Sequence, residues 1–298
     1  MAKQYPIHQS PLYKLSGLKQ LESCLSIDLN RLDKLLKEGA YRTWDNDNDR
    51  EIQHPQGWLG QVHKKIAKYL SKLETPDYVY HKKNRSHIKN AAEHLGFHPV
   101  VKTDISSYYP SVTKQMLKKM FIKHFKCAID IAVILSDICT YRRTHLATGS
   151  PVSGYLAFWA NKDMFDRVYE LSKFKGCTFT LYVDDLTISG GAATKSLLKE
   201  IRGLVAKTGM KTKDSKSITF PPYAAKTITG VIIKGNECFL PNARHKDIAA
   251  DRVSIETLGN SEAQEVIKKS LNGKLMAAKQ ITNLKPAEIV TSMDLIYS

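Results

Sequence analysis

Apolar residues recur every three or four positions in five stretches of the chain, a spacing that places them on one face of an α-helix. The stretches are residues 16–40, 58–73, 112–125, 150–171 and 194–208. Thr113 suits the N-cap of the third helix, while Ser150 and Pro151 suit the N-cap and first position of the fourth. The fourth helix is expected to bury a stripe made of Leu156, Ala160, Met164, Val168 and Leu171. The chain beyond about residue 244 is basic and is also predicted to be helical.

Shorter apolar runs bounded by turn residues predict β-strands. They cover residues 97–105, 178–183 and 186–189, with a hairpin at 227–241. The polar segment 43–57 is predicted to be a solvated loop. Its Asp45, Asp47 and Asp49 imitate the start of a calcium-binding loop, but Arg50 and Gln56 stand where that loop needs glycine and glutamate. The succession indicates an α+β fold, in which helices pack on one face of a core sheet.

The 298-residue chain carries 45 lysines and arginines against 29 aspartates and glutamates, a net charge of +16. This excess favours a polyanionic partner, because each phosphate contact releases condensed counterions. An anionic membrane is the alternative, but we find neither a run of about 18 apolar residues nor a basic amphipathic terminus. Five scattered cysteines without a CxxC pair, and an N-terminus without an apolar run, favour the cytoplasm. We therefore expect a nucleic-acid partner and no membrane.

Asp184 and Asp185 are adjacent at the junction of two predicted strands, although aspartate is a poor strand former and like charges repel. A plain hairpin turn, where aspartate is welcome, explains the pair if it stands alone. A divalent cation would offset the repulsion, and magnesium prefers carboxylate oxygens. Asp104 ends another predicted strand and could complete a site for two metal ions about 4 Å apart. Such a site supports an in-line displacement that releases pyrophosphate.

The segments DISSYYPSV and YVDDLTISG, which contain these three aspartates, resemble the two metal-binding motifs of reverse transcriptases. The bacterial retron and group II intron enzymes are the most similar. The resemblance implies that Asp104, Asp184 and Asp185 are catalytic and hold two Mg²⁺ ions. It also implies that the backbone carbonyl of Ile105 is a further metal ligand.

Further motifs of that family follow in the same order. Tyr109 matches a steric gate against the ribose 2′-hydroxyl, and the alternative is an aromatic residue of the core. Segment 82–94 resembles a part of the fingers that grips the triphosphate, which makes Lys83 and Arg85 nucleotide-binding candidates unless they form a solvated charge run. Lys216 matches a lysine that follows the catalytic hairpin, where it could protonate the leaving pyrophosphate or lie along the template.

The segment HLATGSPVSG resembles the motif that packs under the incoming base, so Gly149 is another nucleotide-binding candidate. The family usually shows a glutamine before this glycine and a second proline after it. This chain has Thr148 and Gly154 at those positions. Gly149 and Ser150 nevertheless keep the close backbone approach that the motif provides.

Two segments point to the retron branch of the family. Residues 90–94 read NAxxH, and the tripeptide ITG resembles the retron VTG, which lies where those enzymes meet their own structured RNA. Asn90, His94, Thr229 and Gly230 are therefore expected to bind RNA. Seen in isolation, NAAEH would more simply be a helix turn with His94 in a cap or in the core.

The resemblance covers about residues 60–285 and implies a right-hand polymerase fold. Its expected parts are N-terminal helices and fingers at 1–103, palm at 104–126 and 149–235, a fingers insertion at 127–148 and a short helical thumb at 236–298. Such an enzyme copies a cognate noncoding RNA into branched, RNA-linked single-stranded DNA from dNTPs. An effector protein joins it in anti-phage defence. The alternatives are an abortive-infection type defence polymerase, protein-primed or template-independent, and a catalytically silent RNA-binding scaffold.

Overall fold

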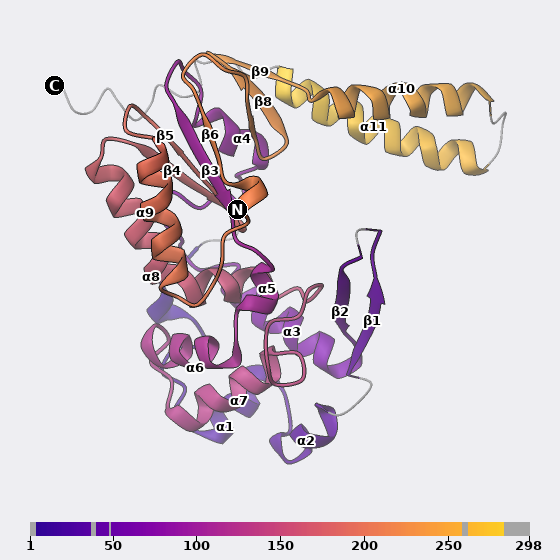
Figure 1. Ribbon diagram of the computed structural model, residues 1–298. Helices are drawn as coiled ribbons and strands as arrows, with labels where there is room; N and C mark the ends of the chain where they lie inside the picture. The colour runs from indigo at the N-terminus through magenta and orange to yellow at the C-terminus, as the bar shows by residue number, and fades with distance from the viewer. Residues whose placement is uncertain (1–3, 37–39, 48, 258–261, 283–298) are drawn as a thin grey trace. The chain divides into compact units, whose positions relative to one another are not determined.

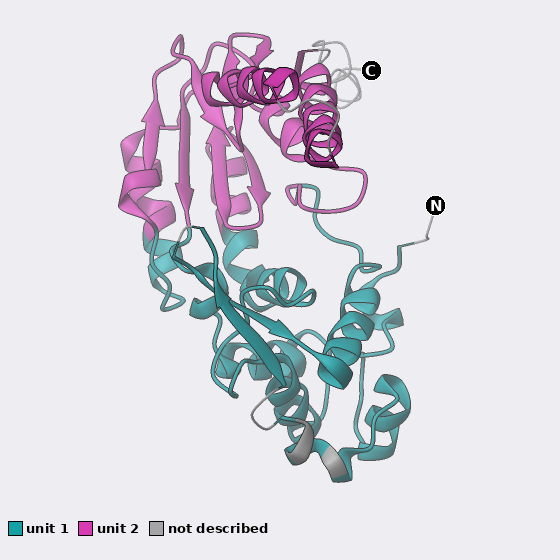
Figure 2. Ribbon diagram, turned by 90° about the vertical axis from the view of Figure 1, so that its right-hand side faces the viewer, with its two compact units in different colours: residues 1–77, 105–167, 203–212 teal, residues 78–104, 168–202, 213–298 magenta. Residues whose placement is uncertain are grey.

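The computed structural model describes residues 4–36, 40–47, 49–257 and 262–282 (Figure 1). The chain divides into two compact units, each assembled from separate stretches of sequence (Figure 2). Unit 1 comprises residues 1–77, 105–167 and 203–212, and unit 2 comprises residues 78–104, 168–202 and 213–298. None of the described helices is both long and apolar enough to cross a membrane.

Unit 1 is mostly helical. Its elements are η1 (Ile7–Gln9), α1 (Leu18–Leu25), η2 (Leu29–Arg31), α2 (Leu32–Leu35), β1 (Tyr41–Asp45), β2 (Glu51–Pro55), α3 (Gly57–Leu70), α5 (Tyr108–Ser111), α6 (Lys114–Lys123) and α7 (Ile129–Cys139). The helices predicted at 58–73 and 112–125 are confirmed as α3 and α6. The side chain of Thr113 accepts a hydrogen bond from the amide of Met116, which confirms the predicted N-cap.

The single helix predicted at 16–40 is wrong. α1 ends at Leu25, and its C-cap residue Ser26 has a left-handed φ of 56°. The Asp28 side chain then caps η2 by accepting a hydrogen bond from the amide of Asn30. Short polar side chains compete with the helix backbone for hydrogen bonds and so favour caps and turns. Two such residues interrupt a spacing that is otherwise helical.

The solvated loop predicted at 43–57 is also wrong, because β1 and β2 form an antiparallel hairpin there. Trp44 stands opposite Ile52, and the Asn46 amide donates to the carbonyl of Arg50 across the tip. Aromatic and β-branched residues favour strands, and they flank the polar tip on both sides. The aspartates of the tip are typical of a loop, but the strand-forming residues Trp44 and Ile52 on either side decide the conformation.

Unit 2 contains two antiparallel sheets. Its elements are α4 (His87–Ala92), β3 (Val100–Asp104), β4 (Thr178–Tyr182), β5 (Asp185–Ser189), η3 (Asp214–Lys216), β6 (Ile218–Phe220), β7 (Lys226–Ile228), β8 (Val231–Lys234), β9 (Glu237–Phe239), α10 (Asn242–Thr257) and α11 (Glu262–Thr282). The strand orders are β4-β5-β3-β6 and β7-β8-β9. The predicted strands and hairpin are confirmed, as is the helical C-terminal region where it is described. The helix expected beyond residue 282 lies outside the described residues.

Two helices, α8 (Ser153–Phe174) and α9 (Lys195–Ala206), have residues in both units. α9 confirms the helix predicted at 194–208. α8 begins at Ser153 rather than at Pro151, because the two residues before it form a turn. Within the predicted stripe Leu156, Met164 and Val168 are buried, whereas Ala160 and Leu171 are half-buried.

The four-stranded sheet has two different faces, because side chains alternate along each strand. Val101, Phe179 and Ile188 leave one face and are buried. Val100 leaves the other face and joins a core with Ile88 of α4 and with residues of β7, β8 and β9. Figure 1 shows α9 along one side of this sheet and α4 on the other. The predicted α+β class, an antiparallel sheet packed on helices, is confirmed.

Candidate active site

Two of the predicted carboxylates meet on neighbouring strands of unit 2. In the antiparallel register of β3 and β5, Asp104 stands directly opposite Asp185, so both side chains leave the same face of the sheet. Asp184 occupies the turn between β4 and β5. Like charges directly opposite each other destabilise a sheet. This register therefore needs a positive charge or a proton to offset the two carboxylates.

The pKa values of the aspartate pair reflect this crowding. Burial and the neighbouring Asp104 carboxylate raise the pKa of Asp184 to about 7. Burial also raises the pKa of Asp185, and the positive charge of Lys102 works against that rise. The site thus holds negative charge that a bound cation would stabilise.

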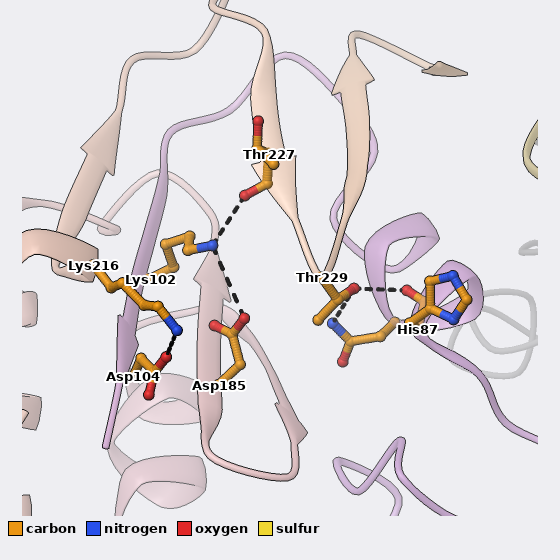
Figure 3. A network of polar contacts seen from close by, with 8 residues as sticks. His87, Lys102, Asp104, Asp185, Lys216, Thr227 and Thr229 are labelled. Carbon is orange, nitrogen blue, oxygen red and sulfur yellow. Dashed lines mark hydrogen bonds and ion pairs between the residues drawn. The ribbon is translucent and has the colours of Figure 1, made fainter. Parts of the chain in front are cut away.

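Two lysines supply positive charge in the structure shown in Figure 3. The Lys216 ammonium pairs with Oδ2 of Asp104, and this contact raises the pKa of Lys216. Lys102 Nζ lies 3.9 Å from Oδ2 of Asp185 and donates to the backbone carbonyl of Thr227 at 3.2 Å. Lys216 is one of the predicted residues, whereas no motif indicates Lys102. The alternation along β3 was the available signal, since it puts Lys102 on the face that carries Asp104.

The three carboxylates fit a divalent cation. Oδ1 of Asp185 is buried and has no hydrogen-bond partner among the described residues, so an acceptor is available there. Within the described ranges, no three His, Cys, Asp or Glu side chains already surround a common metal position. In the structure the carboxylates of Asp104 and Asp185 face the ammonium groups of Lys216 and Lys102. Hard carboxylate oxygens are nevertheless the ligands that Mg²⁺ prefers, and a cation could replace the two lysines.

The turn that carries Asp184 is strained and is held by a histidine. Val183 is β-branched and has a φ of 61°, in the left-handed region that such residues rarely adopt. Its amide donates a hydrogen bond to Nδ1 of His81 at 3.0 Å. Burial lowers the pKa of His81 to about 4, so the ring is neutral near pH 7 and Nδ1 can accept.

No motif indicates His81, because its position depends on how the segment before it pairs with β4. The amide of Leu181 in β4 donates to the carbonyl of Tyr78 at 2.7 Å, and the amide of Tyr80 donates to the carbonyl of Leu181 at 2.9 Å. The segment 78–81 therefore runs beside β4 and ends at the turn that carries Asp184. His81 is a positioning residue for that turn.

The two basic candidates of the fingers motif differ in their surroundings. Lys83 is exposed, whereas Arg85 is half-buried, with its guanidinium 4.3 Å from the centroid of the Tyr80 ring. A cation over an aromatic face is held in place by the ring quadrupole. Arg85 is thus the more ordered of the two, and their contact with a triphosphate stays a prediction.

Ile105, Tyr109 and Gly149 belong to unit 1. The Ile105 side chain is buried, and the Tyr109 ring packs against Tyr108 with centroids 5.7 Å apart. A Cβ on Gly154 would lie 3.6 Å from the hydroxyl of Tyr109, an ordinary van der Waals contact, so the space beside Tyr109 does not itself require glycine here. The roles of Ile105, Tyr109 and Gly149 at the nucleotide stay predictions.

The loop at 148–150 is fixed by the β1–β2 hairpin. The amide of Thr148 donates to Oε1 of Gln53 at 2.9 Å, and the amide of Gln53 donates to the carbonyl of Thr148 at 2.6 Å. The carbonyl of Gly149 accepts from Nδ1 of His54 at 3.0 Å. Thr148, which departs from the family pattern, is therefore anchored through its backbone, and its side chain supplies none of these contacts.

Asn90 and His94 are both fully buried, at 0% exposure. The His94 ring lies between the hydroxyls of Thr180 and Ser189, at 2.7 Å from each. Burial lowers the pKa of His94 to about 3, so the ring is neutral. Neither side chain reaches the surface of unit 2. RNA binding by Asn90 and His94 stays a prediction, and buried side chains could contribute to it only indirectly.

The other two RNA-binding candidates form the turn between β7 and β8. Thr229 is half-buried and Gly230 is exposed. Nδ2 of Asn90 donates to Oγ1 of Thr229 at 3.4 Å, so the structure brings the NAxxH and ITG segments together. Their direct contact with RNA stays a prediction.

No model of a known protein family matches the chain. Among solved structures, the chain is similar to apo telomerase from Candida tropicalis truncated from its C-terminal domain, with a TM-score of 0.46 and 12% identity over 68% of this chain and 55% of that one. It is also similar to telomerase from Candida albicans in complex with a fragment of telomeric RNA, with a TM-score of 0.47 and 9% identity over 87% of this chain and 59% of that one.

Three of the curated proteins that match parts of the sequence are retron reverse transcriptases. The chain is 26% identical over 217 residues to the retron Se72 reverse transcriptase of Salmonella heidelberg (strain 579083-10), covering 68% of this chain and 57% of that protein. It is 24% identical over 220 residues to the retron Ec86 reverse transcriptase of Escherichia coli, covering 73% and 66%. It is 27% identical over 105 residues to the retron Ec48 reverse transcriptase of Escherichia coli, covering 35% and 26%. The chain therefore spans 57% and 66% of the length of the first two relatives. These named relatives confirm the family indicated by the motifs, and the chain is a homologue of the retron reverse transcriptases.

Proposed function

We propose that the chain is an RNA-directed DNA polymerase of a retron, which copies a cognate noncoding RNA into branched, RNA-linked single-stranded DNA. The observation that carries the proposal is the register that sets Asp104 opposite Asp185, beside the turn of Asp184, in a homologue of retron reverse transcriptases. A silent RNA-binding scaffold would gain nothing from these carboxylates, because they repel both one another and bound phosphates. The substrates are dNTPs, and the RNA and its DNA product are partners.

The proposed cofactor is two Mg²⁺ ions, held by the carboxylates of Asp104, Asp184 and Asp185 and by the backbone carbonyl of Ile105. When bound, such ions activate the attacking hydroxyl and neutralise the leaving pyrophosphate. The role of the protein is to hold the carboxylates in register on a hydrogen-bonded sheet. The observation in favour is the buried, unpartnered Oδ1 of Asp185 among the described residues.

Lys216 is proposed to act on the triphosphate of the incoming nucleotide. Its side chain is 52% exposed and is paired with Asp104. The ammonium carries a proton at neutral pH, and the pairing raises its pKa, so the proton is held more tightly while Lys216 stays on Asp104. Proton donation to the leaving pyrophosphate would follow the release of that pair. A change of side-chain rotamer is enough to move this ammonium from the carboxylate toward a phosphate beside it.

The remaining expectations complete the proposal. The right hand is divided as the motifs imply, with fingers at 1–103 and 127–148, palm at 104–126 and 149–235, and thumb at 236–298. Strands β4, β5 and β6 then lie in the palm, which begins at Asp104, the last residue of β3. Lys83 and Arg85 bind the triphosphate, Tyr109 excludes the 2′-hydroxyl and Gly149 lies under the incoming base. Thr229 and Gly230 contact the RNA, while Asn90 and His94 hold the elements behind them. We place this activity in the cytoplasm, with an effector protein in anti-phage defence.

The first experiment measures DNA synthesis by the purified chain on a primed RNA template with dNTPs and Mg²⁺. Asp185→Asn keeps the size of the side chain and removes its charge, so we expect a loss of roughly 100-fold or more. Asp130→Asn is the matched control, because Asp130 is exposed in the first turn of α7 and belongs to none of the motifs. A wild-type chain that makes no DNA, together with an inert Asp185→Asn, would refute the enzymatic proposal.

A second experiment distinguishes a retron enzyme from other polymerases. The nucleic acid that copurifies with the wild-type chain is sequenced and treated with a debranching enzyme specific for 2′–5′ bonds. A single RNA species joined to DNA through such a bond supports the retron assignment. DNA attached to protein, or synthesis that needs no template, would instead indicate a polymerase of the abortive-infection type.

A further inference from the structure

The turn between β7 and β8 holds an unfavourable residue. Both turn residues have positive φ, 44° at Thr229 and 77° at Gly230, as in hairpin turns of type I′. Such turns favour Asn, Asp or Gly, because a β-branched side chain is strained at positive φ. Strain of this kind persists only where the surroundings hold it, and it tends to mark functional positions.

Two residues of α4 hold the strained threonine (Figure 3). Oγ1 of Thr229 donates to the backbone carbonyl of His87 at 2.7 Å and accepts from Nδ2 of Asn90 at 3.4 Å. The Asn90 side chain is fully buried, so its amide cannot turn to solvent instead. The hydroxyl of Thr229 thus anchors the turn to α4.

The strand that leads into this turn contacts Lys102. The carbonyl of Thr227 accepts from Nζ of Lys102 at 3.2 Å, and the same ammonium lies 3.9 Å from Oδ2 of Asp185 (Figure 3). Its side chain is only 13% exposed. The backbone from Thr229 to Thr227 and the two contacts of Lys102 therefore connect the turn to a candidate metal ligand.

The Lys102 ammonium lies closer to the carbonyl of Thr227 than to the carboxylate of Asp185. A hydrogen bond at 3.2 Å is within the normal range for a direct contact, whereas 3.9 Å is too long for a direct hydrogen bond to Asp185. The backbone of β7 therefore holds the ammonium just short of the carboxylate. Lys102 offsets the charge of Asp185 without occupying the position of a ligand.

We propose that Lys102 is a positioning residue that links the Thr229–Gly230 turn to Asp185, so that RNA bound at the turn affects how strongly the lysine competes with Mg²⁺. While the turn is anchored, Lys102 stays on the carbonyl of Thr227. When the turn is released, this acceptor moves, and the ammonium pairs directly with Asp185. The naming of RNA as the ligand of the turn rests on the proposed function, whereas the link itself does not.

The test is a Mg²⁺ titration of the purified full chain, in which the melting temperature Tm is measured at each Mg²⁺ concentration. An ion that binds the folded state raises Tm. Thr229→Val removes the hydroxyl and keeps the shape, and Thr229→Gly removes the hydroxyl and relieves the strained φ. Both are expected to raise the half-saturating Mg²⁺ concentration by about threefold, an effect of the size seen for coupled neighbours. Lys102→Met, which removes the competing ammonium, is expected to lower it.

The decisive variants combine the two positions. If Lys102 transmits the effect, Thr229→Val in the Lys102→Met background leaves the half-saturating concentration unchanged. Thr229→Ser keeps the hydroxyl and should behave as wild type. Lys199→Met is the matched control, since Lys199 is exposed on α9 and its loss removes the same charge.

The proposal is overturned if Thr229→Val and Thr229→Gly both titrate like wild type, or if their shift persists in the Lys102→Met background. Kinetics on a primed RNA template give a second readout, in which Lys102→Met lowers kcat and leaves the KM for dNTP unchanged. A wild-type chain that binds Mg²⁺ but makes no DNA would contradict the proposed function and would not contradict the link through Lys102. The titration would still decide whether the link exists.

Discussion

At the scale of single residues, the turn that carries Asp184 is held by a side chain 102 positions earlier in the chain. The amide of Val183 points away from the sheet ladder, and Nδ1 of His81 is its acceptor at 3.0 Å. Only a neutral imidazole can accept there, and the low pKa of His81 ensures that form at neutral pH. This hydrogen bond therefore helps to fix the turn that carries Asp184.

Two substitutions separate the acceptor of His81 from its bulk. His81→Leu fills the site but leaves the Val183 amide unpaired, so we expect a loss of about 1–3 kcal/mol in stability and a fall in kcat. His81→Asn offers a carbonyl oxygen near the position of Nδ1 and should recover part of both. Urea unfolding and single-turnover DNA synthesis measure the two quantities. Equal defects in the two variants would show that the hydrogen bond does not matter.

At the scale of elements, the β1–β2 hairpin decides the conformation of the loop that resembles the nucleotide-packing motif. Gly149 has a φ of 109°, and a Cβ there would lie 2.7 Å from Cγ2 of Ile52 on β2. Both the backbone and the neighbouring strand therefore require glycine. The hairpin was not predicted, so this reason for Gly149 became clear only when β2 was placed.

Gly149→Ala is expected to lower the free energy of unfolding by about 1–3 kcal/mol, because the left-handed φ and the clash with Ile52 both oppose a side chain. Gly203→Ala is the matched control within a helix. Gly203 lies inside α9 with no atom within 4 Å of a new Cβ, so alanine should stabilise by about 0.5–1 kcal/mol. Denaturant unfolding of both variants provides the comparison. A neutral Gly149→Ala would show that the loop adapts.

At the scale of the whole molecule, both units contain a histidine that is buried in its neutral form. Burial lowers the pKa of His63 in unit 1 to about 4, and those of His81 and His94 in unit 2 to about 4 and about 3. In the unfolded chain these groups take up protons below their ordinary pKa of about 6.5. The unfolded state therefore binds more protons on acidification, and the folded state loses stability.

The predicted pH dependence follows from that difference. Between pH 6.5 and 5 the free energy of unfolding should fall by up to about 1.4 kcal/mol per pH unit for each histidine, while ordinary carboxylates stay ionised. Asp184 acts in the opposite direction, because its raised pKa lets the folded state take up a proton in the same range. The measurement is therefore made without Mg²⁺ in an Asp184→Asn background, by urea unfolding at several pH values. Constant stability across this range would contradict the burial of neutral histidines.

The sequence by itself determined the features that depend on neighbours along the chain. The periods of apolar residues predicted α3, α6, α8 and α9, and the apolar runs predicted the strands around the aspartates. Residue type and order within the motifs indicated Asp104, Asp184 and Asp185 as candidate site residues. They also indicated the resemblance to retron reverse transcriptases, and the named relatives confirm this resemblance. These features are local, since a few adjacent side chains set the helix face, the strand and the motif.

Only the tertiary structure decided which distant residues meet. The strand register opposes Asp104 to Asp185 and turns Lys102 toward them, while Asn90 meets Thr229 across 139 positions. The helix expected at 16–40 and the loop expected at 43–57 failed because caps and strand pairing override local spacing. Hydrogen bonding and burial between segments far apart in sequence leave no period along the chain. They decide how the carboxylates suggested by the motifs are held, and by which neighbours.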